Sequence, residues 1–452
     1  AKFRPDFARI LSSTLNSVIL TNSVESWLKL FMLPKCVLPS CKRRGRHNRP
    51  ISIKFLCDLW AKDDFMTLWN LAKGRSRSLA NYSVSRDEAS SHHTIDSAIS
   101  LARDGLIRKA SRVLLSDGIA PNNDQTWKLL QSKHPSCPLP LAPEVISEPL
   151  SLGRNFDILS VLKSFPKDTA AGPSGLRVQH LLDAASIPLA TSICSSLKSI
   201  VNHLASGKAP NVIAKFLAGG ALTALNKIKP DCTLDVRPIA VGETLRRLTG
   251  KCLCLLVKAK ASDFFDPLQF GVACPLGSEK VIHGIRNCVD QHWGDEDFAV
   301  LKVDLKNAFN LVSRQAFLDE CASVFPNLLP WALWCYGVHS ILWHPMGHLS
   351  SKSGVQQGDP LGPLLFALVL HKVISAIDAD DECLNLLYQA WYMDDGVLAG
   401  KRSAVIRALS LIMELGPSLG LVVNIGKCEL FCKNDVSMFP EALKVSTVPH
   451  FE

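Results

Sequence analysis

Long apolar runs are missing from this sequence of 452 residues. The best candidate for a membrane span, Leu361–Leu370, meets His371 and Lys372 after about ten residues, whereas a spanning helix needs about 18 or more. An initiating Met and a secretory leader of the charged-then-apolar kind are also missing. These absences argue against a membrane-spanning or secreted protein. We expect a soluble, intracellular chain, nuclear or cytoplasmic, that is part of a longer protein.

Charged residues are scarce as well, at 20% of the chain, yet 50 Lys and Arg outnumber 41 Asp and Glu and leave a net charge of +9. This surplus is a mild indication of a polyanionic partner. The 15 cysteines are odd in number and irregularly spaced, which favours a reducing compartment over a disulfide scaffold. With 47% hydrophobic residues, the chain can form large cores in about two to four domains.

Residues 1–150 are predicted to be a mainly helical region whose function the sequence does not reveal. Helical apolar spacing runs from Ile10 to Leu33, and a basic segment at residues 42–49 either contacts phosphate or is a solvated linker. Cys36, Cys41 and His47 lie close to this segment, but a zinc site needs a fourth ligand and none is evident.

A Pro-rich passage from Pro135 to Pro149 follows a polar, helical stretch and marks the expected main domain boundary. Beyond it, apolar strand-like runs alternate with helical segments up to the C-terminus. Such alternation is typical of an α/β or α+β domain.

Two acidic segments in this part of the chain are candidates for chemistry. Phe298–Asp304 is a β-prone run that ends in an acid, and residues 305–309 then read as the start of a helix. Farther on, Trp391–Val397 contains Asp-Asp-Gly between two apolar strands and predicts a hairpin whose tip presents carboxylates. Asp-Asp-Gly is often only a turn. With only four tyrosines in the sequence, however, a chance Tyr-x-Asp-Asp is expected in about one such chain in a hundred.

A third segment, Gly354–Phe366, is a Gly/Pro loop that leads directly into an apolar helix. The three segments together resemble the palm of a reverse transcriptase of the non-LTR (LINE-like) retrotransposon branch. Flanking segments extend the resemblance over about residues 150–435. They are Ala171–Gly175, Arg237–Ile239 with Lys227 and Lys229 before it, Gln269–Gly271, and Gly420–Cys428.

The resemblance implies a right-hand polymerase fold with fingers at 151–260 and palm at 261–440. Residues 441–452 would begin a primer-grip and thumb region that continues past Glu452, so no thumb is expected in this chain. Three positions depart from the family pattern: Asn310 stands where many relatives have Asp, Gln356 where many have Arg, and Gly362 where many have Ser.

Nucleotidyl transfer from a dNTP to a primer 3′-hydroxyl needs two divalent ions about 3.5–4 Å apart. Hard ions such as Mg²⁺ prefer carboxylate oxygens, which Asp304 and Asp394 would supply, and Mn²⁺ is an alternative. The resemblance adds the backbone carbonyl of Leu305 as a ligand. Asp395 ranks lower, as a partial or outer ligand, because adjacent strand residues point in opposite directions.

The resemblance also implies a set of substrate contacts. Phe309 would stack beneath the incoming sugar and exclude a 2′-hydroxyl, although its helical spacing also suits a core residue. Gln357 and Gly358 would pack against the nucleotide. Basic side chains would contact the phosphates: Arg237, Lys227 and Lys229 on the triphosphate, and Lys427 on the departing pyrophosphate, unless Lys427 is a solvated surface charge.

The expected activity is therefore RNA-directed DNA synthesis, with an RNA template, a DNA primer and dNTPs as partners. A viral RNA-dependent RNA polymerase shares the metals, but usually carries Gly-Asp-Asp and a small or acidic residue where Phe309 stands. A reverse transcriptase of the group II intron type remains an alternative. So does an inactive, truncated or domesticated remnant that binds nucleic acid without turnover.

Overall fold

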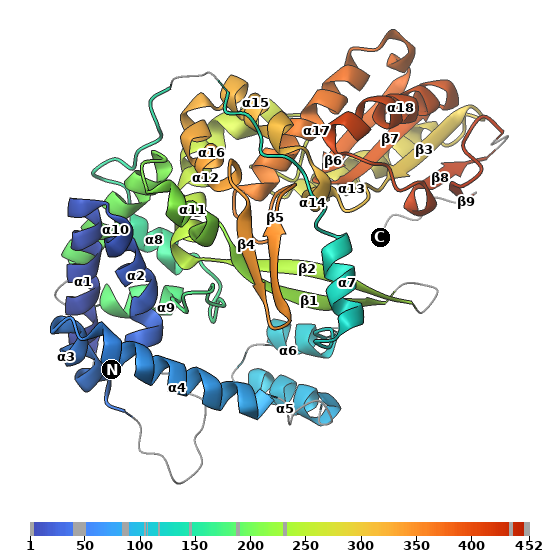
Figure 1. Cartoon of the computed structure of the whole chain (residues 1–452). Helices are drawn as coiled ribbons and strands as arrows, with labels where there is room; N and C mark the ends of the chain where they lie inside the picture. Colours follow the sequence, from blue (N-terminus) through green and yellow to red (C-terminus); the bar gives the residue numbers. More distant parts are fainter. Residues whose placement is uncertain are drawn as a thin grey trace.

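The structure is a computed structural model, and it combines a helical N-terminal half with two β-sheets (Figure 1). The residues that it describes are 4–38, 51–83, 90–103, 105, 107–115, 118–143, 147–186, 190–228, 233–433 and 437–446. The mixed helix and strand composition confirms the predicted class. Among the described residues, the longest and most apolar helices still fall short of what crossing a bilayer requires.

The N-terminal helices form because apolar side chains recur every three or four residues and face a common core. In α1 (Arg4–Thr21), Phe7, Leu11, Leu15 and Val18 are buried along one face. α1 packs against α2 (Val24–Val37) and α10 (Ala190–Ala205). Eight further helices occupy this half of the chain: α3 (Ile53–Ala61), α4 (Phe65–Ser83), α5 (Ser90–Arg103), α6 (Ile107–Leu114), α7 (Asp124–Ser132), α8 (Ile158–Lys163), α9 (Val178–Ala184) and α11 (Asn211–Leu217).

The first sheet has four strands in the order β2-β1-β4-β5. Its strands are β1 (Gly220–Ile228), β2 (Leu234–Gly242), β4 (Ser340–His344) and β5 (Gly347–Ser351). One face carries Leu222, Val236 and Leu342, which pack with Leu130 of α7. Figure 1 shows α7 beside the strands of this sheet. A helix from the N-terminal region thus supplies part of this sheet's core.

The second sheet has five strands in the order β6-β7-β3-β8-β9. These are β3 (Phe298–Val303), β6 (Leu386–Tyr392), β7 (Asp395–Lys401), β8 (Glu429–Cys432) and β9 (Lys444–Ser446). β3 is the central strand, and five of its six residues are buried, which explains its continuous apolar sequence. Its Phe298 and Val300 pack toward α13 (Gly277–His292), and α18 (Arg402–Leu415) also contacts β3.

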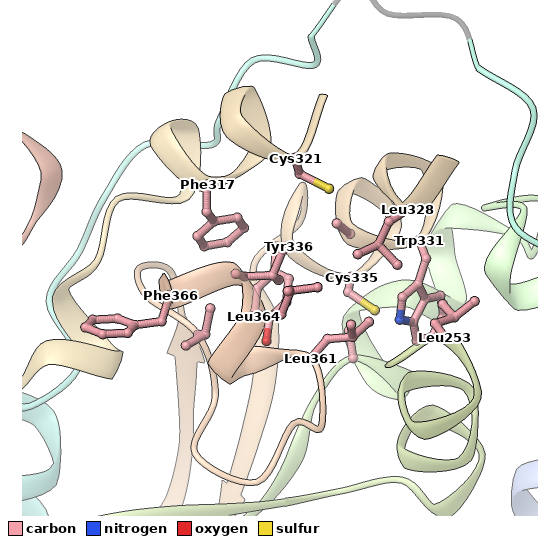
Figure 2. Close-up of a cluster of buried hydrophobic side chains, with 14 of the residues drawn as sticks. Leu253, Phe317, Cys321, Leu328, Trp331, Cys335, Tyr336, Leu361, Leu364 and Phe366 are labelled. Carbon is pink, nitrogen blue, oxygen red and sulfur yellow. The ribbon is translucent and has the colours of Figure 1, made fainter. Parts of the chain in front are cut away.

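A large core packs against the five-stranded sheet, and Figure 2 shows part of it. It lies among α12 (Thr244–Phe265), α15 (Arg314–Val324), α16 (Leu329–Tyr336) and α17 (Gly362–Asp378). The Trp331 and Trp334 rings stack with centroids 5.5 Å apart, and Phe317 meets Tyr336 edge to face at 5.2 Å. This packing fixes the loop before α17, where one of the predicted motifs lies.

The helical character of the N-terminal region is confirmed in its described residues. Buried residues of α1 and α2, such as Leu11 and Trp27, belong to the same apolar cluster as Leu197 of α10 and Leu253 of α12. The core therefore continues across the Pro-rich passage, while the domain limits remain predictions. The basic segment at 42–49, with Cys41 and His47, lies outside the described residues.

Candidate active site

The three predicted acids meet at one end of the five-stranded sheet. β3 ends at Val303, which pairs with Gly396 of β7, so continuing the antiparallel register sets Asp304 beside Asp395. Tyr392 and Asp395 pair at the end of the β6–β7 hairpin, and Met393 and Asp394 form its turn. Met393 has a φ of +59°, a left-handed conformation that closes this tight turn. The predicted strand and hairpin are thus present and adjacent.

The carboxylates influence one another electrostatically. Burial raises the pKa of the Asp394 carboxyl, and the charges of Asp395 and Asp304 raise it further, while Arg237 acts in the opposite direction. Desolvation and then the charge of Asp304 raise the pKa of Asp395. Both shifts mean that the folded chain disfavours the fully ionised cluster. A bound cation would relieve this repulsion.

Asp304 is oriented by the turn before β8. The side-chain amide of Asn424 donates to Asp304 Oδ1 at 2.8 Å, and the backbone N–H of Asn424 donates to the Asp304 carbonyl at 2.8 Å. Lys427 Nζ lies 3.9 Å from the same Oδ1. The predicted Lys427 is therefore next to the acids, and Asn424 positions Asp304.

Gln269 holds the hairpin turn from the other side. Its amide oxygen accepts hydrogen bonds from the backbone N–H groups of Met393 and Gly271, each at 2.9 Å, and its amide nitrogen donates to the Met393 carbonyl at 3.3 Å. A Cβ at Gly271 would lie 2.6 Å from the Met393 nitrogen, so only glycine allows this approach. The Gln-x-Gly segment thus acts by clamping the turn.

The donor set suits Mg²⁺ in kind, because it consists of carboxylate oxygens. Within the described part of the chain, however, no group of three or more His, Cys, Asp or Glu side chains is gathered closely enough to hold a metal ion. One oxygen of Asp304 is directed to Asn424 and Lys427 instead. Metal ligation by Asp304, Leu305, Asp394 and Asp395 therefore remains a prediction that their charges support.

The Gly354–Phe366 loop connects the helix after Asp304 with the four-stranded sheet. Val355 N–H donates to the Phe309 carbonyl at 2.7 Å, and Ala240 N–H of β2 donates to the Gln357 carbonyl at 3.2 Å. Gly358 has a φ of +118°, and a Cβ there would lie 2.6 Å from the Ala240 carbonyl oxygen. This loop therefore depends on glycine where it crosses β2.

Phe309 lies in α14 (Ala308–Leu311), where the sequence predicts the start of a helix. Its ring is half-buried and stacks on Phe366 of α17, with centroids 4.9 Å apart and planes 15° from parallel. The ring is thus held in place by the helix that follows the loop. A role in sugar selection remains a prediction.

A buried polar network holds the Gly354–Phe366 loop in place. Arg246 of α12, which is 1% exposed, forms an ion pair with Asp359 at 2.8 Å, and the Tyr336 hydroxyl donates to Asp359 at 2.6 Å. Arg246 also donates to Gln356, and the Gln356 amide nitrogen donates to Ser340 at 2.9 Å. Gln356 thus accepts a hydrogen bond from a guanidinium that α12 supplies.

Basic side chains approach the acids from the β1–β2 hairpin. Lys227 pairs with Asp235 across the two strands, and Arg237 pairs with Leu225. Burial lowers the pKa of Lys227, and the charges of Lys427 and Arg237 lower it further. The predicted Lys227, Arg237 and Lys427 are therefore within electrostatic reach of one another. Lys229 lies outside the described residues.

A groove of about 800 Å³ adjoins the hairpin turn. Its lining combines Met393, Gly271, Pro360 and Pro363 with residues of α8 and α12, including two lysines of α12, Lys251 and Lys258. The sequence indicated these loops individually. It gave no sign that α8 and α12 would complete a groove with them, because that depends on tertiary packing.

Comparisons with known proteins identify the family that part of the chain matches. Residues 228–446 match the family model described as Reverse transcriptase (RNA-dependent DNA polymerase). The chain is also similar to the Retrotransposable element SLACS 132 kDa protein of Trypanosoma brucei gambiense, with 26% identity over 269 residues. That match covers 57% of this chain and 21% of the relative, so the chain spans about a fifth of the relative's length.

Similar solved structures include two telomerases. One is telomerase from Candida albicans with a fragment of telomeric RNA, at a TM-score of 0.38 and 14% identity, covering 51% of this chain and 45% of that chain. The other is apo telomerase from Candida tropicalis lacking its C-terminal domain, at 0.37 and 13%, covering 49% and 51%.

The matched segment contains Asp304, the Gly354–Phe366 loop and the hairpin turn. Residues 228–446 therefore match a reverse transcriptase domain. The relationship to a retrotransposable element agrees with the resemblance seen in the sequence. The predicted family is confirmed, and the matches support the predicted enzyme class.

Proposed function

We propose that this chain catalyses RNA-templated DNA synthesis for a retroelement of the non-LTR branch. The observation that carries the proposal is the register of the five-stranded sheet, which sets Asp304 beside Asp395 and next to the Asp394 turn. Acids that repel one another at the end of a central strand favour bound cations, and such cations can in turn bind phosphate. The fingers, at 151–260, would contain β1 and β2 of the four-stranded sheet with the preceding helices α8 to α11. The palm, at 261–440, would contain β4 and β5 of that sheet and strands β3, β6, β7 and β8 of the five-stranded sheet.

Asp304, Asp394 and Asp395, with the Leu305 carbonyl, would hold two Mg²⁺ ions, or Mn²⁺. When bound, the ions would lower the pKa of the primer 3′-hydroxyl and neutralise the charge on the leaving pyrophosphate. Turning the Asp304 side chain from Asn424 toward the ions would complete the site. The backbone hydrogen bond from Asn424 N–H to the Asp304 carbonyl would still hold the strand end, and Gln269 would hold the hairpin turn.

The remaining side chains would bind and orient the dNTP. Arg237 would grip the triphosphate in bidentate fashion and Lys227 would add a point charge, as would Lys229. Phe309, held by Phe366, would lie under the sugar while Gln357 and Gly358 pack against the nucleotide. Lys427, beside Asp304, would support the departing pyrophosphate.

The groove beside the hairpin turn would receive the RNA template paired with the DNA primer. Its lining is mostly apolar, which suits sugars and base edges, and Lys251 and Lys258 can contact phosphates. We propose a nuclear or cytoplasmic location, since both compartments are reducing and contain nucleic acid.

Primer extension tests this proposal. A DNA primer annealed to RNA is incubated with the chain, labelled dNTPs and Mg²⁺, and wild type is compared with Asp394→Ala. We expect wild type to extend the primer and Asp394→Ala to lose about a hundredfold or more in rate, as when a key electrostatic group leaves an active site. Asp381→Ala, which removes a carboxylate outside the site, is the matched control.

The alternative is a remnant that binds nucleic acid without turnover. Equal incorporation by wild type and Asp394→Ala would refute the proposed site. If neither protein extends the primer, and a chain lengthened with its downstream region is also inactive, the remnant becomes the better description. Retained template-primer binding by the inactive proteins would then support it directly.

A further inference from the structure

A lysine from outside the segment that matches the family contacts β2, the strand that carries Arg237. Lys133 follows α7, in the N-terminal region for which the sequence gave no function. Its ammonium contacts both carboxylate oxygens of Asp235 on β2, at 2.9 and 3.0 Å. The Lys133 and Asp235 side chains are 26% and 11% exposed, so this ion pair is partly shielded from solvent.

α7 holds Lys133 firmly in this position. Asn123 caps the helix by accepting a hydrogen bond from Thr126 N–H at 2.9 Å, and Leu130 is fully buried against the four-stranded sheet. Trp127 stacks on His344 of β4 with ring centroids 5.4 Å apart. A cation at the C-terminus of the helix also interacts favourably with the helix dipole.

The backbone around Lys133 is tied to the five-stranded half of the molecule. The Asn307 side-chain amide donates to the Lys133 carbonyl at 3.2 Å, and Asn307 accepts from the Asn310 amide at 2.8 Å. Farther along, Leu141 and Gln315 of α15 exchange hydrogen bonds of 2.7 and 3.3 Å. Figure 1 shows this teal segment running from α7 past α14 and across α15.

Asp235 lies between two lysines. It is the cross-strand partner of Lys227, one of the cations proposed for the triphosphate, and its charge acts on the Lys227 ammonium. Opposite charges on facing strand residues pair readily. If Asp235 turned to Lys227, the phosphates would lose a cation, but in the structure both of its oxygens are directed to Lys133.

We propose that Lys133 is a positioning residue of the nucleotide site: by holding Asp235, it leaves Lys227 free to bind the phosphates of an incoming dNTP. The N-terminal region would thereby take part in substrate binding. The inference rests on the proposed function, and it deepens that function by assigning a role to a residue that no family motif includes.

The test compares KM for dNTP with kcat in primer extension by the full chain. Lys133→Met should raise KM for dNTP about tenfold, the effect of losing one phosphate contact worth about 1.4 kcal/mol, with kcat within about twofold of wild type. KM for the template-primer should not change. Lys133→Arg should behave as wild type, since a guanidinium can hold the same carboxylate. Lys128→Met, an exposed lysine on the same helix, is the matched control.

A double variant separates this role from a merely structural one. Lys133→Met with Asp235→Asn removes the competing carboxylate, so KM for dNTP should return to within about threefold of wild type. A structural defect at position 133 would persist or worsen in the double variant. Unchanged KM in Lys133→Met, or no recovery in the double variant, overturns the inference. If Lys133→Met does not fold, Asp235→Asn alone is the test. The inference predicts no rise in KM for dNTP in this variant, and a raised KM overturns it.

Equilibrium binding of Mg–dTTP to the full chain distinguishes failure of this inference from failure of the proposed function. If wild type binds Mg–dTTP but does not extend primers, catalysis is refuted. The order of the variants' affinities for Mg–dTTP then still tests the role of Lys133. If wild type extends primers and the ranking is absent, only the role of Lys133 is refuted. A wild-type chain that neither binds nor incorporates dNTP overturns both.

Discussion

Phe309 is the residue through which sugar selectivity can be tested. Its ring is half-buried and fixed by stacking on Phe366, so shortening the side chain should open space without displacing the Asp304 strand end. We expect Phe309→Val to raise ribonucleotide incorporation relative to deoxyribonucleotide incorporation by about tenfold or more, the scale of discrimination by a few carbon atoms in a binding pocket. Competing rNTP and dNTP extension on one primed RNA measures this ratio.

Phe366→Leu is the companion variant for that measurement. It removes the ring that supports Phe309 and should give a smaller change in the same direction. Unchanged discrimination between rNTP and dNTP in Phe309→Val would show that Phe309 is only a core residue. Its helical spacing, taken alone, also indicates a core residue.

At the scale of residues, the sequence predicted the acidic residues of the site better than it predicted the hydrogen bonds that position them. Asp304, Asp394 and Asp395 were identifiable because their motifs combine rare residues in a fixed order. Asn424 and Gln269 were visible only as parts of resembling segments, because the hydrogen bonds that give them roles join positions more than a hundred residues apart. Lys133 had no local signal at all, since a single lysine before a Pro-rich passage is unremarkable.

At the scale of elements, the motif loop before α17 depends on α12. Arg246→Ala removes the guanidinium that pairs with Asp359 and leaves a buried carboxylate without its ionic partner. Breaking a buried pair in this way costs about 3–5 kcal/mol in the free energy of unfolding. Urea unfolding followed by tryptophan fluorescence measures the loss, and several buried tryptophans lie in the same core.

Arg4→Ala is the matched control for that experiment. Arg4 also forms an ion pair with an aspartate, Asp183, at 3.1 Å, but both side chains are substantially exposed. Exposed pairs contribute about 0–1 kcal/mol. Equal losses for Arg246→Ala and Arg4→Ala would contradict the structural importance assigned to the buried network.

Strand β3 and the β6–β7 hairpin were the most predictable elements. β3 is apolar on both faces, and the β6–β7 hairpin carries a turn sequence between two apolar runs, so both follow from local pattern. The network around Arg246 was not predictable, because α12 reads from its sequence only as a long helix. Burial of a charge at its N-terminal end depends on an aspartate more than a hundred residues later.

At the scale of the whole molecule, the N-terminal helices and the matched domain share an apolar core and are joined by the partly shielded Lys133–Asp235 ion pair. The N-terminal helices lie outside the segment that matches the family. The sequence therefore predicted that this region is helical, but not where its helices pack. Their packing suggests that the catalytic half depends on them for its four-stranded sheet. The proposed polymerase requires one arrangement, in which Asp304 and Asp394, remote from each other in the chain, bind the same ions.

Fe²⁺ can replace Mg²⁺ and, with ascorbate and peroxide, cut the backbone next to the ion that it occupies. We expect cleavage of the full chain at two places, near Asp304 and near Asp394–Asp395, since the sheet sets these positions side by side. Excess Mg²⁺ should suppress both cuts, and Asp394→Ala should lose both together. Cleavage at only one of the two places, or at neither, would contradict a shared metal site and with it the proposed polymerase.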